Sequence, residues 1–418
     1  MTFAIAFCGA ALRLFFAAVF YLAAPSESHA LTAAERAKAE AAFPGWVERQ
    51  VWPAAKKAGV ARATFDAAFA GVRIDWSLPE LGPGGGVPEG QAEFQSPAAY
   101  FNEKRLADLA ALGRPLLRQW SKTLAGIEKR YGVPAEIVVA IWGRESAYGR
   151  VAPGKLAIAA LATESYVGRR KETFFPELIA ALKILQRGDV QPRQMLSSWA
   201  GALGETQFLP SKFLQFAVDF DGDGRADIWN STPDVLASIA HYLVQHGWTR
   251  GQGWGFEVKA PSAVACSLEG PEQGKPLSAW QKMGVAPLGS LPRYARADTK
   301  FHLLMPAGRL GPAFLVTSNF YDIKDYNNSD LYALFIGQLA DRYIGGGAFA
   351  GGWSKVATGF KRSDVLAIQK RLVAMGHDVG KVDGLVGYKT RIAIGLWQRK
   401  QGMAETCYPD AAVFAGLR

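Results

Sequence analysis

The apolar run at residues 135–150, AEIVVAIWGRESAYGR, constrains the fold most strongly, because it predicts a helix with an apolar face that also carries a carboxylate. Pro134 suits the first turn of this helix, where its missing N–H needs no partner. Glu145 follows Trp142 at the helical spacing i, i+3, so it shares the apolar face, near the end that Gly149 can close.

A carboxyl group in such an apolar setting is partly desolvated, which raises its pKa and keeps it protonated near neutral pH. That protonation state is the one a general acid needs. The alternative is that Glu145 pairs with an arginine and only closes the helix. The helix by itself does not decide between these two interpretations.

The rest of the chain predicts a mainly α fold of the α+β kind. Residues 98–250 consist of helix-like segments broken by Gly and Pro. Between about residues 255 and 320, short runs such as FHLLM and AFLV are typical of strands, and PAGRLGP between them is typical of a hairpin. Residues 329–344 predict a further helix, which Ser329 can cap.

These changes along the chain set the domain boundaries. We assign residues 31–344 to one helical domain with a small β-containing insertion. The glycine-rich residues 345–362 are expected to be a flexible linker. Residues 363–418 predict a separate small unit with a capped amphipathic helix, a tight Gly-rich turn and a second helix.

Residues 1–30 predict an export signal peptide that is cleaved after Ala30. The run LFFAAVFYLAA after Arg13 is short for a membrane span, and SHA matches an A-x-A-like cleavage site. The alternative is an uncleaved anchor, because residues 1–24 are apolar almost throughout. We therefore expect a periplasmic protein, attached to a membrane only if this segment is retained.

The formal net charge of +10 favours an acidic partner, such as nucleic acid, an anionic membrane surface or an anionic wall polymer. We find no nucleic-acid motif and the bases are scattered, so a nucleic-acid partner is not expected. Once the signal is removed, only Cys266 and Cys407 remain, enough for one disulfide in an oxidising compartment. Neither belongs to a C-x-x-C motif, so redox or zinc chemistry is not expected.

Two further segments have the composition of a binding site for a polar ligand. SSWAGALGETQFLPSKF (197–213) places many small residues beside polar ones, which suits a cleft wall where a ligand comes close. YNNSDLYAL (326–334) places Tyr, Asn and Ser at a helix entry, where they can hydrogen-bond to sugar hydroxyl and acetamido groups.

The acidic segment DFDGDGRADIWN (219–230) begins like an EF-hand calcium loop, with a glycine at its sixth position. It departs from that pattern at position 12, where Asn230 replaces the bidentate glutamate. The candidate calcium ligands are three carboxylates at positions 1, 3 and 5, a carbonyl at position 7 and a later carboxylate: Asp219, Asp221, Asp223, Arg225 and Asp234. The alternative is a solvated acidic turn.

Taken together, the motifs resemble the lytic murein transglycosylase B family over roughly residues 35–345. The segments that carry the resemblance occur in the family's order: YGVPAEIVVAIWGRESAYGR, ESYVGRRKETFF, SWAGALGETQFLPSKFLQFAVDFDGDGRADIWN, ASIAHYLVQHGW and YNNSDLYAL. The C-terminal unit resembles the small three-helix peptidoglycan-binding domain, and its D-G-x-x-G-x-x-T core is present as Asp383, Gly384, Gly387 and Thr390.

The resemblance implies a lysozyme-like, mainly helical domain in which Glu145 is the sole catalytic acid and base. It also implies a set of glycan- and peptide-binding residues: Ser146, Arg169, Arg170, Ser198, Gln207, Tyr326 and Asn327. For some of these we keep a structural alternative, namely a loop cap for Gln207, surface bases for Arg169 and Arg170, and a core aromatic for Tyr326. Some family members hold calcium in the acidic loop, which adds weight to a structural Ca²⁺, although the chemistry requires no cofactor.

The implied reaction cleaves the β-1,4 bond between N-acetylmuramic acid (NAM) and N-acetylglucosamine (NAG) in peptidoglycan strands. Glu145 protonates the linking oxygen and then, as a base, activates the sugar's own 6-hydroxyl, which closes onto C1 to form a 1,6-anhydro end. The alternatives are a muramidase that hydrolyses the same bond and a non-catalytic peptidoglycan-binding scaffold. We expect a monomer, with proteins of cell-wall synthesis or remodelling as potential partners.

Overall fold

The structure of the protein is a computed structural model that describes residues 31–82, 97–151, 153–353, 356 and 360–417. The expected signal peptide at residues 1–30 lies outside these described residues. Within the described ranges, no helix combines the length and the apolar character that a membrane crossing requires.

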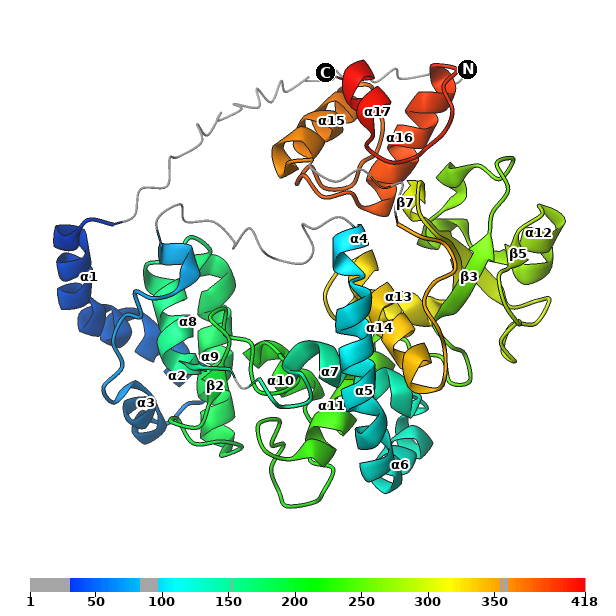
Figure 1. The fold of residues 1–418 in the computed structure, drawn as a ribbon. Coiled ribbons are helices and arrows are strands. Elements are labelled where there is room, and N and C mark those ends of the chain that lie inside the picture. Colours follow the sequence, from blue (N-terminus) through cyan, green and yellow to red (C-terminus); the bar gives the residue numbers. More distant parts are fainter. Residues whose placement is uncertain (1–30, 83–96, 152, 354–355, 357–359, 418) are drawn as a thin grey trace, which may run out of the picture.

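Helices dominate the described residues, as predicted, and form an open arc in Figure 1. One end of the arc contains α1 (Ala33–Trp46), a short π-helix η1 (Val47–Val51), α2 (Trp52–Lys57), α3 (Arg62–Phe69), a 3-10 turn η2 (Pro79–Leu81), α8 (Ala157–Tyr166) and α9 (Lys171–Arg187). The middle and the other end contain α4 (Pro97–Tyr100), α5 (Glu103–Gln119), α6 (Ser121–Tyr131), α7 (Ala135–Ser146), α10 (Pro210–Phe216), α11 (Thr232–His246), α13 (Ser318–Lys324) and α14 (Asp330–Tyr343).

Helix α7 is the predicted apolar helix, and it lies at the centre of the helical core. Every residue from Ile137 to Trp142 is at most 3% exposed, so the helix is buried on all sides rather than along one face. It packs against α5, α6, α11 and α14. A helix that is apolar all round belongs in the interior of a domain, and full burial of each such large side chain stabilises the fold by about 1.5–3 kcal/mol. Only the last turn, with Arg144 and Glu145, leaves this apolar environment.

The predicted closure of α7 by Gly149 is wrong, because the helix ends earlier, at Ser146. Ala147 and Tyr148 adopt positive φ angles of 50° and 64°, which side chains with a Cβ rarely do. The Tyr148 hydroxyl donates to the backbone oxygen of Leu109 at 2.7 Å, so the turn is tied to α5. The chain therefore turns sharply two residues after Glu145, and long-range packing holds that turn.

The predicted β-containing insertion is present as a five-stranded sheet, on the side of the arc beyond α13 and α14 (Figure 1). The strand order is β4-β6-β8-β3-β5, and all the pairs are antiparallel. This region contains β3 (Gly255–Lys259), η4 (Cys266–Leu268), η5 (Pro271–Gln273), β4 (Lys275–Pro276), α12 (Leu277–Lys282), β5 (Ala286–Pro287), β6 (Lys300–Leu304), β7 (Pro306–Arg309) and β8 (Ala313–Val316). A second, two-stranded sheet joins β1 (Lys155–Leu156) to β2 (Leu196–Ser197).

The glycine-rich segment after α14 packs against the domain, which corrects the expectation of a flexible linker. The backbone N–H groups of Ala350 and Gly351 donate to the carboxylate of Glu257 at 2.7 and 2.6 Å. The Trp353 ring stacks on Phe101, with 5.0 Å between ring centroids. A glycine-rich segment is expected to be flexible only when it has no partner, and here β3 and the residue that follows α4 supply partners.

The C-terminal unit is the predicted three-helix domain, with α15 (Arg362–Ala374), α16 (Tyr388–Lys400) and α17 (Ala411–Gly416). The buried amide of Gln369 organises its Gly-rich turn. The Gln369 Nε2 donates to Thr390 Oγ1 at 3.1 Å, and the Gly384 N–H donates to Gln369 Oε1 at 2.7 Å. The D-G-x-x-G-x-x-T core therefore has a structural role in the turn between α15 and α16.

This unit is not separate from the rest of the protein, which corrects a second expectation. A disulfide, which the sequence left open, joins Cys266, beside the sheet, to Cys407, after α16. Arg391 of α16 is 2% exposed and forms ion pairs with the carboxylates of Glu269 and Asp330 at 2.7 and 2.9 Å. A covalent bond and a buried ion-pair network thus join the C-terminal unit to the first domain.

Candidate active site

The carboxyl group of Glu145 lies at the end of α7 and is held by a tyrosine from the opposite helix. The Tyr332 hydroxyl of α14 donates to Glu145 Oε1 at 2.6 Å, although the two residues are 187 positions apart. Burial raises the pKa of Tyr332 well above its usual value, and the charge of Glu145 raises it further. Tyr332 therefore stays protonated and donates its hydrogen bond at every pH where the protein works.

A second tyrosine connects this pair to the segment at residues 197–209. The Tyr326 ring stacks on Tyr332, with 6.2 Å between centroids, and its hydroxyl donates to the backbone oxygen of Thr206 at 2.8 Å. Burial, followed by the charge of Glu145, raises the pKa of Tyr326 well above its usual value. Tyr326 thus lies within the electrostatic reach of Glu145 and positions the loop that carries Gln207.

The predicted ligands of the 197–213 segment lie in a tight loop with partly exposed side chains. The Gln207 Nε2 donates to the Gly204 backbone oxygen at 2.9 Å, and the Ser198 hydroxyl accepts from the Ala202 N–H at 3.1 Å. Both side chains also hold the loop, so the structural alternative considered for Gln207 applies as well. Asn327 is exposed in the turn before α14, beside Tyr326.

Backbone strain is concentrated around these residues. Non-glycine residues with positive φ among the described residues are Ala147, Tyr148, Gln207, Asn328 and Cys407. The first four lie next to Glu145, within the 197–209 loop or next to Asn327. Such conformations cost about 1–3 kcal/mol each and persist where the surrounding structure enforces them, commonly at functional sites.

Ser146 has a different position from the one expected for a substrate ligand. Its side chain is 1% exposed, and its hydroxyl donates to the Trp142 backbone oxygen at 3.1 Å and accepts from the Gly149 N–H at 3.0 Å. Both hydrogen-bonding directions of the hydroxyl are used at the end of α7 itself. We therefore correct its assignment to a residue that positions Glu145.

A second carboxyl group, Glu205, lies against the same helix end and was missed by the sequence analysis. The Trp142 indole N–H donates to Glu205 Oε2 at 2.6 Å. A Cβ at Gly149 would lie 2.6 Å from that same oxygen, so only glycine fits there. Burial raises the pKa of Glu205 despite the hydrogen bond from Trp142. Glu205 therefore contacts Trp142, before Glu145 in the chain, and lies against Gly149, after it.

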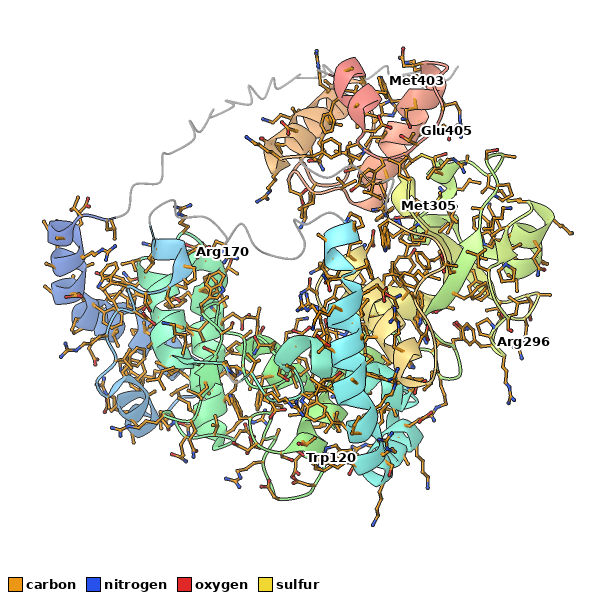
Figure 2. All side chains as sticks on the ribbon, viewed as in Figure 1. Trp120, Arg170, Arg296, Met305, Met403 and Glu405 are labelled. Carbon is orange, nitrogen blue, oxygen red and sulfur yellow. A yellow bond between two sulfur atoms is a disulfide. The ribbon has the colours of Figure 1, made fainter. Side chains whose placement is uncertain are left out.

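The predicted arginine pair lies at the start of α9, and only Arg170 is joined to other residues of the site. Arg170 Nε donates to the Glu80 carboxylate at 2.8 Å, and its guanidinium lies 6.0 Å from the Trp199 ring. In Figure 2 the Arg170 side chain lies at the upper end of the part of the arc that contains α8 and α9. Arg169 is exposed and makes no hydrogen bond or ion pair with the described residues.

Arg170 is supported by a buried carboxyl pair, which gives a testable dependence of stability on pH. Burial and, after it, the neighbouring Glu80 together raise the pKa of Glu164 to about 8. The folded protein therefore holds a proton on Glu164 up to about pH 8, whereas the unfolded chain releases it near 4.5. The resulting stabilisation is complete below pH 4.5 and is lost as the pH rises through 8.

We expect the melting temperature of the wild type to fall between pH 5 and 8.5 relative to that of a Glu164→Gln variant. The difference in the free energy of unfolding changes by up to about 1.4 kcal/mol per pH unit, because one proton is released. Thermal melts of both proteins over this range measure it, with Glu172→Gln on the exposed first turn of α9 as control. Parallel pH profiles for wild type and Glu164→Gln would contradict the assignment.

A cavity of about 700 Å³ opens beside Glu145, between the ends of α5 and α7. Its lining includes Asn102, Lys104 and Arg105 from α5 and its N-cap, and Arg144, Glu145 and Ala147 from α7 and its last turn. The catalytic candidate thus faces a space large enough for part of a ligand. Besides Glu145 and the three basic side chains, its lining includes Asp108, which pairs with Lys104 at 2.7 Å.

Three of the five predicted ligands of the acidic loop lie close to one another. The carboxylates of Asp219, Asp221 and Asp223 are exposed, with one oxygen of each within 4.8 Å of the others. The Asp234 carboxylate is 0% exposed and accepts the backbone N–H groups of Phe220 and Asp227 at 2.7 and 2.9 Å. Its predicted role as a replacement ligand is therefore wrong, because it braces the loop from the inside.

Residues 42–341 match the family model described as a transglycosylase SLT domain, which covers most of the chain. The chain belongs to this family. The C-terminal residues 361–417 match a second model, described as a putative peptidoglycan binding domain. These matches confirm the predicted fold class: a lysozyme-like helical SLT domain with a small β-containing insertion, followed by a three-helix C-terminal domain.

Related SLT-domain proteins come from two bacteria. The chain is 34% identical over 218 residues to the membrane-bound lytic murein transglycosylase B of Escherichia coli (strain K12), and the match covers 50% of this chain and 56% of that protein. It thus spans about half the length of this curated relative.

Two sets of solved structures extend the comparison. The crystal structure of SltB3 from Pseudomonas aeruginosa in complex with NAG-NAM-pentapeptide is 44% identical, with a TM-score of 0.81 over 90% of this chain and 99% of that one. SltB3 was also solved in complex with NAG-anhNAM-pentapeptide. The Escherichia coli lytic transglycosylase Slt35 in complex with calcium is 26% identical, with a TM-score of 0.55 over 73% of this chain and 92% of that one.

Proposed function

We propose that this SLT-domain protein is a lytic transglycosylase that cleaves the β-1,4 bond between NAM and NAG in peptidoglycan strands and leaves 1,6-anhydro ends. The observation that carries the proposal is the Glu145 carboxyl group at the end of a buried helix, held by Tyr332 at 2.6 Å beside a cavity. The family membership, the SltB3 complexes and the C-terminal peptidoglycan-binding domain support the same substrate.

In the first step, Glu145 acts as a general acid. Because the Tyr332 hydroxyl donates to Oε1, the neutral carboxyl group carries its proton on Oε2, and it transfers this proton to the oxygen that links the two sugars. The bond from C1 of NAM to that oxygen breaks as the proton arrives. The acetamido group of the same sugar stabilises the positive charge that develops at C1.

In the second step, the ionised Glu145 acts as a base. The hydrogen bond from Tyr332 stabilises the carboxylate, since hydrogen bonds to a charged group are stronger than those between neutral groups. Glu145 takes the proton of the 6-hydroxyl of NAM, whose oxygen closes onto C1. One residue thus handles both protons, and no water is consumed.

The alternative of hydrolysis by a muramidase requires a group that activates water. Glu205 is the second carboxyl group at this helix end, and its Oε2 is engaged by the Trp142 indole. This contact favours a bracing role for Glu205 and a mechanism with one catalytic carboxyl group.

Digestion of purified sacculi, followed by mass spectrometry of the soluble fragments, tests the proposed function. Fragments with 1,6-anhydroNAM ends support it. Fragments with reducing ends would replace it with hydrolysis, and the absence of fragments would leave a peptidoglycan-binding scaffold.

The proposed reaction takes place in the periplasm, where the wall polymer is found. Two features support this location: the signal-like residues 1–30 and the Cys266–Cys407 disulfide, which is typical of oxidising compartments. We propose that the exported protein acts as a monomer, and that any contacts with proteins of wall synthesis or remodelling are made on surfaces away from Glu145.

We also propose a structural calcium ion in the acidic loop, which the reaction itself does not use. The carboxylates of Asp219, Asp221 and Asp223 and the backbone oxygen of Arg225 would hold it, and oxygen donors suit this hard cation. Asn230 takes the place of the usual bidentate glutamate, and its side chain donates to Asp227. The shortened ligand set fits calcium but predicts weak binding.

We expect calcium to raise the melting temperature of the wild type and not that of Asp223→Ala. At a hundredfold excess over Kd, the gain in the free energy of unfolding is about 2.7 kcal/mol. Thermal melts with calcium and with EGTA measure the gain, and Asp298→Ala, an exposed acid beside the sheet, serves as control. Equal melting temperatures with and without millimolar calcium would contradict the site.

A further inference from the structure

The cavity beside Glu145 contains two arginines that form no ion pair with the described residues, although the charge of Glu145 acts on Arg144. Arg144 has one hydrogen bond to a side chain, from Nη2 to the Tyr100 hydroxyl at 3.2 Å, and its guanidinium lies over the Tyr100 and Phe335 rings. Its Nε atom is buried and has no hydrogen-bond partner. Within the described residues, no carboxylate lies within ion-pair distance of Arg144 or of Arg105.

The two guanidinium groups lie close enough to affect each other. Burial lowers the pKa of Arg105, and the positive charge of Arg144 lowers it further. Two like charges at the edge of one cavity are unfavourable unless an anion offsets them. The repulsion at Arg105, together with its place in the cavity lining, indicates room for a negatively charged group of a ligand.

Two other features of the cavity favour an anion at the same position. Helix α5 begins there, since Asn102 caps it by accepting the Arg105 N–H at 3.0 Å, and the N-terminus of this 17-residue helix carries a partial positive charge. The planar guanidinium forks of the arginines match the geometry of a carboxylate, which they can bind through paired hydrogen bonds.

We propose that Arg105 and Arg144 bind a carboxylate of the substituent that NAM carries, and that this contact makes the protein select strands in which that carboxylate is free. The proposal rests on the proposed function, because Glu145 lines the same cavity and fixes where the NAM ring must lie. NAM carries its lactyl ether on the ring whose C1 reacts, so the substituent leaves that ring next to Glu145. NAG has no such acid, and the site therefore distinguishes the two sugars.

The carboxylate has two chemical sources. In strands without peptides it is the carboxylate of the lactyl group itself. In substituted strands the lactyl group is amidated by the peptide, and the carboxylates are those of the peptide. Both present the same charged group to the arginines, so the experiment must separate them.

Four NAG-NAM-NAG-NAM tetrasaccharides separate the sources: one with lactyl carboxylates, one with lactyl carboxamides, one with pentapeptides and one with pentapeptides whose carboxylates are amidated. Each compound with free carboxylates forms a pair with the compound in which they are amidated. In one of the two pairs, we expect the wild type to cleave the carboxylate compound with a kcat/KM about tenfold above that of the amide, because the amide cannot make a charge-assisted contact with the arginines. The pair that shows the difference identifies the source.

Substitutions of the two arginines test whether these side chains bind the carboxylate. In Arg105→Gln and Arg144→Gln, the ratio between acid and amide falls towards one, whereas Arg105→Lys keeps part of the ratio. Arg118→Gln, an exposed arginine near the other end of α5, keeps the wild-type ratio. Arg105 is exposed, so its variant folds even if that of Arg144 does not.

The possible failures are distinct. Equal cleavage of acid and amide by the wild type in both pairs would overturn the carboxylate site and leave the reaction intact. An unchanged ratio in Arg105→Gln would also overturn it. No cleavage of any tetrasaccharide would instead count against the proposed function.

Discussion

Replacing Glu145 by glutamine lowers the turnover of glycan strands by at least about a thousandfold and leaves the fold unchanged. The loss is large because one residue performs both proton transfers, each of which contributes about 10²–10⁴-fold. Glutamine has nearly the same shape, and its amide oxygen can still accept the Tyr332 hydrogen bond. Release of soluble fragments from sacculi measures the rate, and a thermal melt verifies the fold.

Glu136→Gln provides a matched control, because it makes the same chemical change in the first turn of the same helix. We expect that variant to keep at least half of the wild-type rate. Binding of Glu145→Gln to intact sacculi should also equal that of the wild type, since the C-terminal domain is unaffected. Turnover near the wild-type rate in Glu145→Gln would remove this residue from the mechanism.

Replacing Arg391 by methionine lowers the free energy of unfolding by about 3–5 kcal/mol, because it leaves buried carboxylates without their cation. Glu269 is 0% exposed, and burial raises its pKa although Arg391 acts in the opposite direction, so it would lose the cation that offsets its burial. Asp330 is held by Lys324 and Arg391, whose charges outweigh the effect of burial and lower its pKa to about 2. Asp330 therefore stabilises the fold at pH values above its unfolded pKa, and that contribution is lost as the pH falls towards 2.

Urea or thermal unfolding at pH 7 measures the effect of Arg391→Met. Arg399→Met is the control on the same helix, since Arg399 is half exposed and pairs with Glu405 near the surface, where such pairs contribute about 0–1 kcal/mol. Adding Glu269→Gln to Arg391→Met should recover part of the loss by removing the unpaired charge. A loss for Arg391→Met no larger than that for Arg399→Met would show that the buried network does not hold the C-terminal domain.

The sequence predicted the catalytic residue because Glu145 is an anomaly in a local pattern. An acid in an apolar helix is visible in sixteen consecutive residues and needs no knowledge of the rest of the fold. Tyr332 has no such signal, since an aromatic residue in an amphipathic helix is typical of a core. Only the packing of α14 against α7 brings its hydroxyl to Glu145.

The errors have the same origin, because each concerns a residue whose partner is distant in sequence. The glycine-rich segment after α14 is held by Glu257, more than ninety residues earlier. The C-terminal unit is held by Cys266 and Asp330, which belong to the first domain. Asp234 is a ligand by spacing, but its carboxylate faces the backbone of its own loop.

The outcome of the reaction tests the central claim most directly. Cleavage of a NAG-NAM-NAG-NAM tetrasaccharide in water enriched in ¹⁸O separates the two chemistries by mass spectrometry. We predict 1,6-anhydroNAM ends without ¹⁸O, because the 6-hydroxyl of the sugar closes the ring and no water enters. Reducing NAM ends that carry ¹⁸O would contradict the account and identify the protein as a hydrolase.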